Sequence, residues 1–187
     1  AQVLIAVTAH GDLGGRQPVL RSGAKVGDVI AVGGTLGKAA AGLALLQSGN
    51  ADAVAAYDEL VAVQLRPQPP VALGVLASEA GATAMLDISD GLSRDLARIA
   101  AASQVSAKLN SSELQGFEAM LEQAAQAIAA NPAEWVLHGG EDHSLLATFA
   151  PTAQLPRGFK PIGRIEQGQG IFLDAAPLEA KGWDSTH

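Results

Sequence analysis

The segment from residue 82 to residue 99 joins a hydrophobic run, an acidic turn and an amphipathic stretch, and it limits the possible folds more than any other part of the chain. The run from Ala82 to Leu86 is mostly apolar and predicts a buried strand. Apolar residues then recur at helical spacing: Leu92, Leu96 and Ile99. Three charged residues are expected on the outward face of this helix: Arg94, Asp95 and Arg98. The segment therefore predicts a strand that leads directly into a helix.

The turn between them reads Asp87-Ile88-Ser89-Asp90-Gly91. Side chains alternate along a strand, so Asp87 and Ser89 are expected on the same side, with Asp90 at the helix N-cap and Gly91 allowing the turn. Carboxylate and hydroxyl oxygens at such a place suit hard cations and the phosphates that they carry. The alternative is that Asp90 only caps the helix and Asp87 only accepts local backbone hydrogen bonds. These five residues alone leave both interpretations open.

Composition limits the function classes. Hydrophobic residues make up 48% of the 187 residues, which is enough for one folded domain with a sizeable core. Aromatic residues make up only 4%, so alanine and the aliphatic residues must fill that core. The formal net charge of -7, with lysine and arginine scattered, argues against a nucleic-acid partner. An acidic protein can still bind anionic nucleotides through divalent cations.

Signals for export or membrane insertion are missing from the sequence. The absence of cysteine excludes disulfides and thiolate metal sites. The apolar run from Val3 to Val7 is too short to span a bilayer and has no basic flank. We therefore expect a cytoplasmic protein without a membrane partner.

The remaining elements alternate irregularly along the chain. Further strands are expected at residues 2–8, 28–32, 105–109, 144–149, 161–165 and 170–173. Further helices are expected at residues 36–47, 52–64 and 71–80, and one more is marked by Phe117, Leu121, Ala125 and Ile128 and closed by Asn131-Pro132. This order predicts the α/β class, with a mixed β-sheet covered by helices rather than a regular doubly wound fold.

A glycine-rich segment, Gly33-Gly34-Thr35-Leu36-Gly37-Lys38, invites comparison with a phosphate-binding P-loop. That motif needs Gly-x4-Gly-Lys followed by Ser or Thr. Here Val32 stands at the first glycine position and Ala39 follows Lys38, so we reject the P-loop. The segment is instead expected to be a tight strand-to-helix turn.

A second acidic cluster, Gly139-Gly140-Glu141-Asp142, precedes a predicted strand. Its glycines permit close backbone approach, and its two acids would face an approaching ligand. Taken alone, the cluster is more typical of a turn with solvated charges, but together with the first acidic cluster it favours a ligand site. His138 and His143 flank the cluster, and their spacing does not match a zinc motif, so we expect ordinary loop histidines.

Two single residues remain ambiguous from sequence alone. Arg21 could clamp a phosphate or lie solvated at the surface. Trp183 could stack on an aromatic ring or cover the edge of the core.

Together these segments resemble the thiamine-monophosphate kinase family, within the superfamily that includes aminoimidazole-ribonucleotide synthetase. The matching segments, in order, are Arg21-Ser22-Gly23-Ala24 with Gly27-Asp28, Gly34-Thr35-Leu36-Gly37 with Ala40-Ala41-Gly42-Leu43, Leu65-Arg66-Pro67-Gln68-Pro69, Met85-Leu86-Asp87-Ile88-Ser89-Asp90-Gly91-Leu92, Gly139-Gly140-Glu141-Asp142 and Gly182-Trp183-Asp184. Superfamily relatives share the Asp-x-Ser-Asp-Gly segment, whereas Gly-Gly-Glu-Asp followed by a late Gly-Trp singles out the thiamine enzymes.

The resemblance implies transfer of the γ-phosphoryl group of ATP to thiamine monophosphate. The transfer is direct and in-line, and several Mg²⁺ ions assist it. By resemblance, Asp87 and Asp90 would hold magnesium. Phosphoryl transfer depends mainly on positioning and on neutralising charge at the phosphate oxygens, so this assignment is chemically coherent.

The resemblance also implies the substrate contacts. Arg21 and Ser89 would contact ATP. Glu141 would bind thiamine monophosphate, where a carboxylate beside the cationic thiazolium is electrostatically favourable, and Trp183 would pack on the ring system. No side chain is expected to act as a covalent or acid–base catalyst.

The resemblance covers only part of the family's pattern. Family members have an N-terminal domain with an acidic metal-binding motif and a Gly-Gly-Asp segment, and this sequence has neither. Residues 1–17 would be a remnant strand and linker of that domain, and residues 18–187 would be the C-terminal α/β domain. We therefore expect a fragment that is inactive alone, from a parent protein that dimerises through the missing domain.

Three positions depart from the family pattern: Lys38-Ala39 replaces Asp-Ser, Pro70 replaces Arg, and His143 replaces Tyr. None of them is a residue assigned above. Two alternatives stay open: another ATP-using member of the superfamily, such as an aminoimidazole-ribonucleotide or selenophosphate synthetase, or a non-catalytic nucleotide-binding module. Magnesium-dependent binding of thiamine monophosphate would favour the kinase, whereas binding of ATP alone would leave the module possible.

Overall fold

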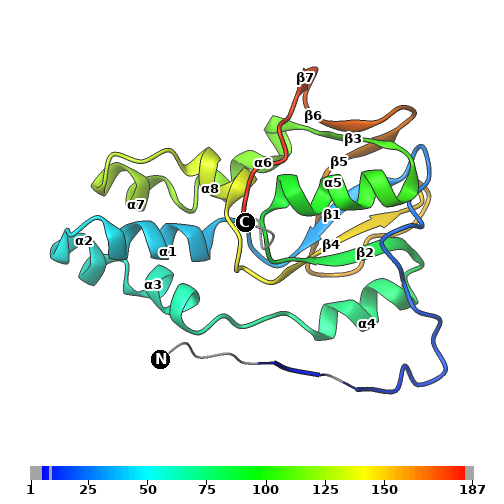
Figure 1. The fold of residues 1–187 in the computed structure, drawn as a ribbon, viewed down its shortest axis with the longest axis horizontal. Helices are drawn as coiled ribbons and strands as arrows, with labels where there is room; N and C mark the ends of the chain where they lie inside the picture. Colours follow the sequence, from blue (N-terminus) through cyan, green and yellow to red (C-terminus); the bar gives the residue numbers. More distant parts are fainter. Residues whose placement is uncertain (1–5, 9, 184–187) are drawn as a thin grey trace.

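A seven-stranded sheet forms the centre of the computed structural model, which describes residues 6–8 and 10–183 (Figure 1). The strands lie in the order β2-β4-β1-β5-β3-β6-β7. Their bounds are β1 Val29–Gly33, β2 Ala82–Ile88, β3 Ser106–Leu109, β4 Ser144–Phe149, β5 Phe159–Glu166, β6 Gly170–Leu173 and β7 Ala176–Pro177. Neighbouring strands pair antiparallel except β3 and β6, which are parallel. The expected α/β class with a mixed sheet is confirmed.

Helices cover both faces of the sheet because side chains alternate along its strands. In β1, Ile30 and Val32 belong to the main core, whereas Ala31 belongs to a second cluster on the other face. The helix α5, Leu92–Ser103, packs on the main-core face against β2, β3 and β6. The helix α4, Ala72–Glu79, contacts β2 and β4 and places Ala77 in the second cluster.

The other helices are α1 Lys38–Gln47, α2 Ala51–Ala56, α3 Asp58–Leu65, α6 Ser111–Glu118, α7 Glu122–Ala127 and α8 Pro132–His138. In Figure 1, α1, α2, α3, α7 and α8 extend beyond one end of the sheet. The helix α3 lies closely against α1: a Cβ at Gly42 would be 2.2 Å from the carbonyl oxygen of Leu60.

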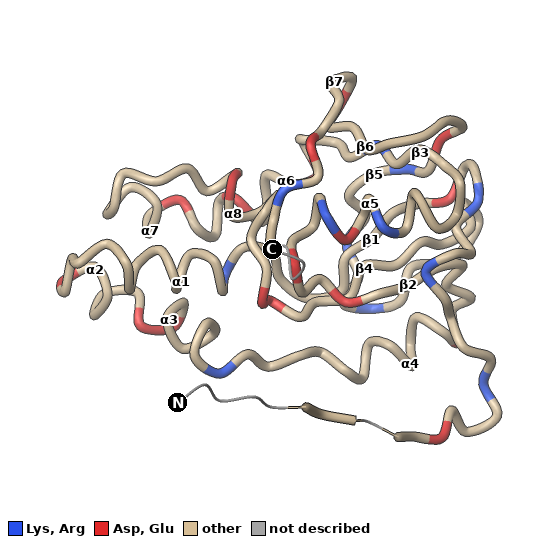
Figure 2. The backbone as a smooth tube through the Cα atoms, viewed as in Figure 1, with Lys and Arg blue, Asp and Glu red and all other residues tan. Residues whose placement is uncertain are grey.

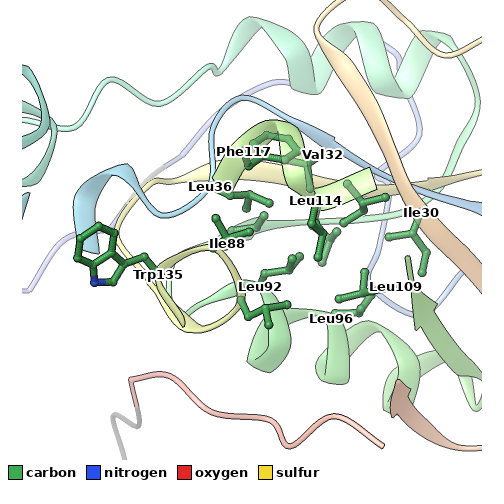
Figure 3. Close-up of a cluster of buried hydrophobic side chains, with 14 of the residues drawn as sticks. Ile30, Val32, Leu36, Ile88, Leu92, Leu96, Leu109, Leu114, Phe117 and Trp135 are labelled. Atoms are coloured by element: carbon green, nitrogen blue, oxygen red, sulfur yellow. The ribbon is translucent and has the colours of Figure 1, made fainter. Parts of the chain in front are cut away.

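The main core lies between α5 and the sheet and continues toward α1, α6 and α8 (Figure 3). Aliphatic residues and alanine form most of it, and Phe117 and Trp135 supply its aromatic side chains. The second cluster contains Phe149 and Phe159, whose rings pack edge to face with centroids 5.4 Å apart. As the composition predicted, aliphatic residues and alanine fill most of the interior.

Most predicted elements are observed within two residues at either end, but two predicted helices differ. The helix expected at 52–64 is divided into α2 and α3, because Tyr57 leaves helical geometry with φ -121° and ψ 39°. This break lets α3 turn back against α1. The helix expected through Phe117 and Ile128 is likewise divided, into α6 and α7.

Asn131-Pro132 begins a helix instead of closing one. The Asn131 side chain accepts a hydrogen bond from the Ala133 amide at 3.0 Å, and Pro132 occupies the first helical position of α8. An N-cap followed by proline is a common helix start, so the signal was present but read in the wrong direction. The strand β7 was also not predicted.

The strand expected at residues 2–8 lies largely outside the described residues. Its described part, residues 6–8, is not in a strand. The proposed division between residues 1–17 and 18–187 stays a prediction.

Candidate functional site

The two acidic segments lie side by side, although they are about fifty residues apart in the sequence. The Glu141 amide donates to the Ser89 carbonyl oxygen at 2.9 Å, and the His143 amide donates to the Ile88 carbonyl oxygen at 3.1 Å. A Cβ at Gly140 would lie 2.3 Å from the Ser89 carbonyl oxygen, so only glycine permits this approach. The sheet thus brings the end of β2 and the loop before β4 together at one corner.

The C-terminal segment reaches the same corner. The Trp183 amide donates to the Asp90 carbonyl oxygen at 3.1 Å. Gly182 has φ 129°, and a Cβ there would lie 2.1 Å from the same oxygen. Trp183 is 70% exposed, so it does not cover the core, and its backbone lies beside the acidic segments.

Asp95, rather than Asp90, accepts the backbone hydrogen bonds at the N-terminus of α5. The N-cap position is Gly91, with φ 121° and no side-chain cap. Asp95 Oδ2 accepts from the amides of Asp90 and Gly91 at 3.0 and 3.1 Å. The first amides of a helix lack internal acceptors and attract negative charge, so a carboxylate from the first turn can replace the expected cap.

The expectation that Asp95 faces outward is therefore wrong: the residue is fully buried. Burial raises the pKa of Asp95, while the backbone hydrogen bond at Asp90 and the nearby Arg98 guanidinium lower it. Arg98 forms ion pairs with both Asp90 and Asp95. Asp90 is thus held by Arg98 through its side chain and by Trp183 through its backbone.

Asp142 likewise accepts hydrogen bonds at the N-terminus of α1. Its Oδ1 accepts from Thr35 Oγ1 at 3.0 Å and from the Lys38 amide at 3.2 Å. Burial raises the pKa of Asp142, while hydrogen bonds from Thr35 and from the backbone at the start of α1 lower it. The expectation that both acids of Gly-Gly-Glu-Asp face a ligand is wrong for Asp142, which is 5% exposed.

The residues on either side of Asp142 point outward. Glu141 and His143 have φ 68° and 49°, left-handed values that non-glycine residues adopt at a cost. The His143 imidazole lies between two carboxylates, with Nδ1 3.7 Å from Asp87 Oδ2 and Nε2 3.6 Å from Glu141 Oε2. The side chains of Asp87 and Glu141 are 54% and 60% exposed, so both carboxylates are open to a ligand.

Five predicted site residues therefore come from segments that meet at one corner: Asp87, Ser89, Asp90, Glu141 and Trp183. Asp87 is the penultimate residue of β2, which ends at Ile88, so Ser89 already lies beyond the strand. The expectation that Asp87 and Ser89 share one face of a strand is therefore not met, because only Asp87 belongs to the strand.

Arg21 lies elsewhere, in an exposed turn whose carbonyl oxygen accepts from Ser103 Oγ at 3.1 Å. Ser103 ends α5, which has 12 residues and a length of about 18 Å. The backbone of Arg21 is thus near the far end of α5, and its assigned role stays a prediction.

The glycine-rich segment before α1 is a tight turn, as expected. Gly34 and Gly37 have φ 119° and 77°. A Cβ at Gly34 would lie 2.4 Å from Ser144 Oγ, and one at Gly37 would lie 2.8 Å from the Trp135 carbonyl carbon. His138, expected in a loop, is the last residue of α8, and its Nδ1 lies 2.8 Å from Ser93 Oγ.

Sequence reasoning missed the roles of Asp95 and Asp142. An acid in the first turn of a helix was a usable signal for Asp95. Asp142 had no local signal, because Thr35 and Lys38 lie more than a hundred residues away in the sequence.

Charge at the site is mixed, and Figure 2 shows acidic and basic residues interspersed along the backbone, including on α5. Within residues 6–8 and 10–183, no group of three or more histidines and acids is arranged to hold a metal. Asp87 and Asp90 supply carboxylate oxygens, the donor type that Mg²⁺ prefers, and magnesium commonly combines one or two carboxylates with water and substrate phosphates. The donor chemistry of both residues therefore suits magnesium, and the Asp90 carboxylate also pairs with Arg98. No helix in this part of the chain is long and apolar enough to cross a membrane.

Comparison with known proteins places this geometry in a family. The family of AIR synthase related proteins, C-terminal domain, matches residues 25–174. The chain is 48% identical over 186 residues to a thiamine-monophosphate kinase of Mycobacterium tuberculosis, and the match covers 98% of this chain and 54% of that protein. The chain thus spans about half the length of this relative.

Solved structures agree. The thiamine-monophosphate kinase of Stenotrophomonas maltophilia K279a is 34% identical with a TM-score of 0.72, over 86% of this chain and 54% of that one. AaThiL complexed with AMPPCP and TMP is 35% identical with a TM-score of 0.77, over 89% of this chain and 54% of that one. The chain belongs to the family of AIR synthase related proteins and carries its C-terminal domain.

Proposed function

We propose that the chain is the C-terminal part of a thiamine-monophosphate kinase, which transfers the γ-phosphoryl group of ATP to thiamine monophosphate. The main observation is the corner itself, where backbone hydrogen bonds join Glu141 to Ser89 and Trp183 to Asp90. The names of the relatives and the AMPPCP and TMP bound to AaThiL support the same reaction.

Asp87 and Asp90 would hold magnesium at this corner. Bound magnesium neutralises charge on the phosphate oxygens and orients them for in-line transfer. Asp87 offers an exposed carboxylate, whereas the carboxylate of Asp90 is fixed by Arg98. One exposed acid and one acid held by Arg98 can together bind an ion with the help of water and substrate phosphates.

Glu141 and Trp183 would bind the thiamine part of the substrate. The carboxylate of Glu141 is 60% exposed and attracts the positively charged thiazolium. The accessible indole of Trp183 offers an aromatic face, on which cationic rings bind favourably. Ser89 would contact ATP at this corner. The assignment of Arg21 to the ATP phosphates stays a prediction from the resemblance, because its backbone lies near the other end of α5.

The fragment would contain only half of the site, so we expect it to be inactive alone. The full-length protein would act in the cytoplasm as a homodimer. These statements rest on the resemblance and on the 54% coverage of the relatives.

The test is phosphorus NMR of thiamine monophosphate, ATP and magnesium with this chain and with a full-length form. We expect thiamine diphosphate only with the full-length form. In that form, Glu141→Gln should raise KM for thiamine monophosphate at least about tenfold, which corresponds to 1.4 kcal/mol. The exposed Glu59→Gln in α3 is the matched control and should leave KM unchanged. A folded full-length form without product would favour a sister enzyme or a binding module.

A further inference from the structure

The C-terminal segment, residues 178–183, crosses the corner without helix or strand structure. Its start is tied to the sheet, because the Leu178 amide donates to the Ile171 carbonyl oxygen at 2.9 Å. Its end is tied to Asp90 through the Trp183 amide. Between these two backbone bonds, the segment is held by a side chain: Ser93 Oγ donates to the Lys181 carbonyl oxygen at 2.9 Å.

Ser93 is fully buried in the first turn of α5 and has a second partner. Its Oγ lies 2.8 Å from Nδ1 of His138, the last residue of α8. A hydroxyl has one proton, and here the Lys181 carbonyl oxygen accepts it. The Ser93 oxygen must therefore accept a hydrogen bond from His138 Nδ1–H.

This chain of bonds fixes the tautomer of His138. Neutral histidine carries one ring proton, so a proton on Nδ1 leaves Nε2 without one. Burial lowers the pKa of His138 and thereby favours the neutral form, with Lys181 acting in the same direction and Glu134 and Glu179 opposing it. The order of donors is therefore His138 to Ser93 to the carbonyl oxygen of Lys181.

We propose that Ser93 and His138 are positioning residues that hold the C-terminal segment on the corner and so place Trp183 beside Asp90. The role of Trp183 in substrate binding rests on the proposed function. The placement of Trp183 beside Asp90 rests only on the hydrogen bonds described above. Trp183 lies two residues from the bonded carbonyl of Lys181, and Gly182 between them packs so closely on Asp90 that an added Cβ would lie 2.1 Å from its carbonyl oxygen. Holding an exposed aromatic residue in place before binding removes part of the entropy cost of ordering it later.

The first test needs no variant. Long-range proton–nitrogen NMR of the 187-residue chain reports which ring nitrogen of His138 carries the proton. We expect the Nδ1–H tautomer. A neutral His138 protonated on Nε2 would overturn the proposed order of donors.

The second test compares amide hydrogen exchange at Trp183 in variants. Ser93→Ala and His138→Ala should each accelerate exchange at least about fivefold, the effect of losing one hydrogen bond of ordinary strength. His138→Asn should restore slow exchange, because its side-chain amide can donate from about the position of Nδ1. Ser112→Ala, at an exposed position of α6, is the control and should change nothing.

Amides in the buried part of α5, such as that of Leu96, report global unfolding in the same spectra. Acceleration at Trp183 with an unchanged Leu96 supports the proposal. Unchanged exchange at Trp183 in a folded Ser93→Ala variant would overturn it. If Ser93→Ala unfolds, the tautomer measurement still decides the result.

A final comparison separates the proposal from the proposed function. Thiamine monophosphate is titrated into the unsubstituted 187-residue chain and into Ser93→Ala, with the indole N–H NMR signal of Trp183 as the readout. A response to thiamine monophosphate that is weaker in Ser93→Ala than in the unsubstituted chain supports both the positioning role and substrate binding by Trp183. No response in either protein, together with the expected tautomer and exchange, would contradict substrate binding by Trp183 and leave the positioning role supported.

Discussion

The helices α1 and α5 begin in similar ways but depend on different parts of the chain. Each has a glycine with positive φ at its N-cap and no side-chain cap from that residue: Gly37 for α1 and Gly91 for α5. Each instead uses a buried carboxylate, Asp142 for α1 and Asp95 for α5. The need for an acceptor at a helix N-terminus is thus met twice by aspartate.

The two aspartates differ in origin and in charge compensation. Asp95 belongs to α5 itself and pairs with Arg98. Asp142 comes from the loop before β4, and among the described residues its Oδ2 has no hydrogen-bond partner. The local arrangement stabilises one turn, whereas the long-range one also fixes the loop that carries Glu141.

Substituting the glycines should have the largest effect. Gly91→Ala should lower the free energy of unfolding by about 3 kcal/mol, because φ 121° is strained for alanine and its Cβ would lie 2.5 Å from the His138 carbonyl oxygen. Gly37→Ala should cost less, because φ 77° is closer to the left-handed region that other residues adopt. Urea unfolding of both variants tests this order, and equal losses would contradict it. Gly49→Ala is a control for positive φ without a close contact.

Replacing the aspartates should separate charge from hydrogen bonding. Asp142→Ala should lower the free energy of unfolding by about 2 kcal/mol, because the amides at the start of α1 lose a buried acceptor. Asp142→Asn retains an oxygen for Thr35 and Lys38 and should cost less than about 0.5 kcal/mol. Asp95→Asn should cost about 1–2 kcal/mol, because it removes the ion pair with Arg98. Equal effects of the two asparagine variants would show that the charge of Asp142 is also compensated.

The pH dependence should show a smaller difference. Burial raises the pKa of Asp142 above 3.8, so the native protein retains this proton over a range in which the unfolded chain has lost it. The native state then binds more protons, and the free energy of unfolding falls as pH rises through that range. Asp142→Asn should lack this contribution, so its stability relative to the parent chain should increase with pH from just above 3.8. The free energy of unfolding is measured as a function of pH for both proteins. A difference between them that stays constant across this range would argue against a raised pKa of Asp142.

Sequence reasoning succeeded where the structure depends on short-range pattern. The hydrophobic run before Asp87 predicted the strand β2, and the helical spacing of Leu92, Leu96 and Ile99 predicted α5. The expectation that β2 is buried was wrong, because it is an edge strand of the sheet and most of its residues are half-buried. The glycine spacing before Lys38 predicted a tight strand-to-helix turn, which the structure confirms. These features need no knowledge of distant contacts.

Sequence reasoning was wrong where a polar residue acts across the fold. Asp95 was placed outward by helix periodicity alone, yet amides that precede the helix draw it inward. Asp142 was expected to face a ligand or solvent, because the partners that bury it belong to another segment. Asn131-Pro132 was read as a stop, although the same two residues are equally typical of a start.

Among the substitutions that remove a hydrogen-bonding group, Thr35→Val should have the smallest effect. Thr35 is the one side chain within residues 6–8 and 10–183 that hydrogen-bonds to Asp142. Thr35→Val removes a 3.0 Å hydrogen bond but leaves the amides of α1 in place, so it should cost about 1 kcal/mol, less than Asp142→Ala. Thr152→Val, at an exposed position, is the matched control. In the Asp142→Ala background, Thr35→Val should cost almost nothing, because its partner is already absent, and a double-mutant cycle measures this coupling. Additive losses would mean that Thr35 stabilises the turn independently of Asp142, and the α1 N-terminus would then depend on the loop before β4 less than its geometry indicates.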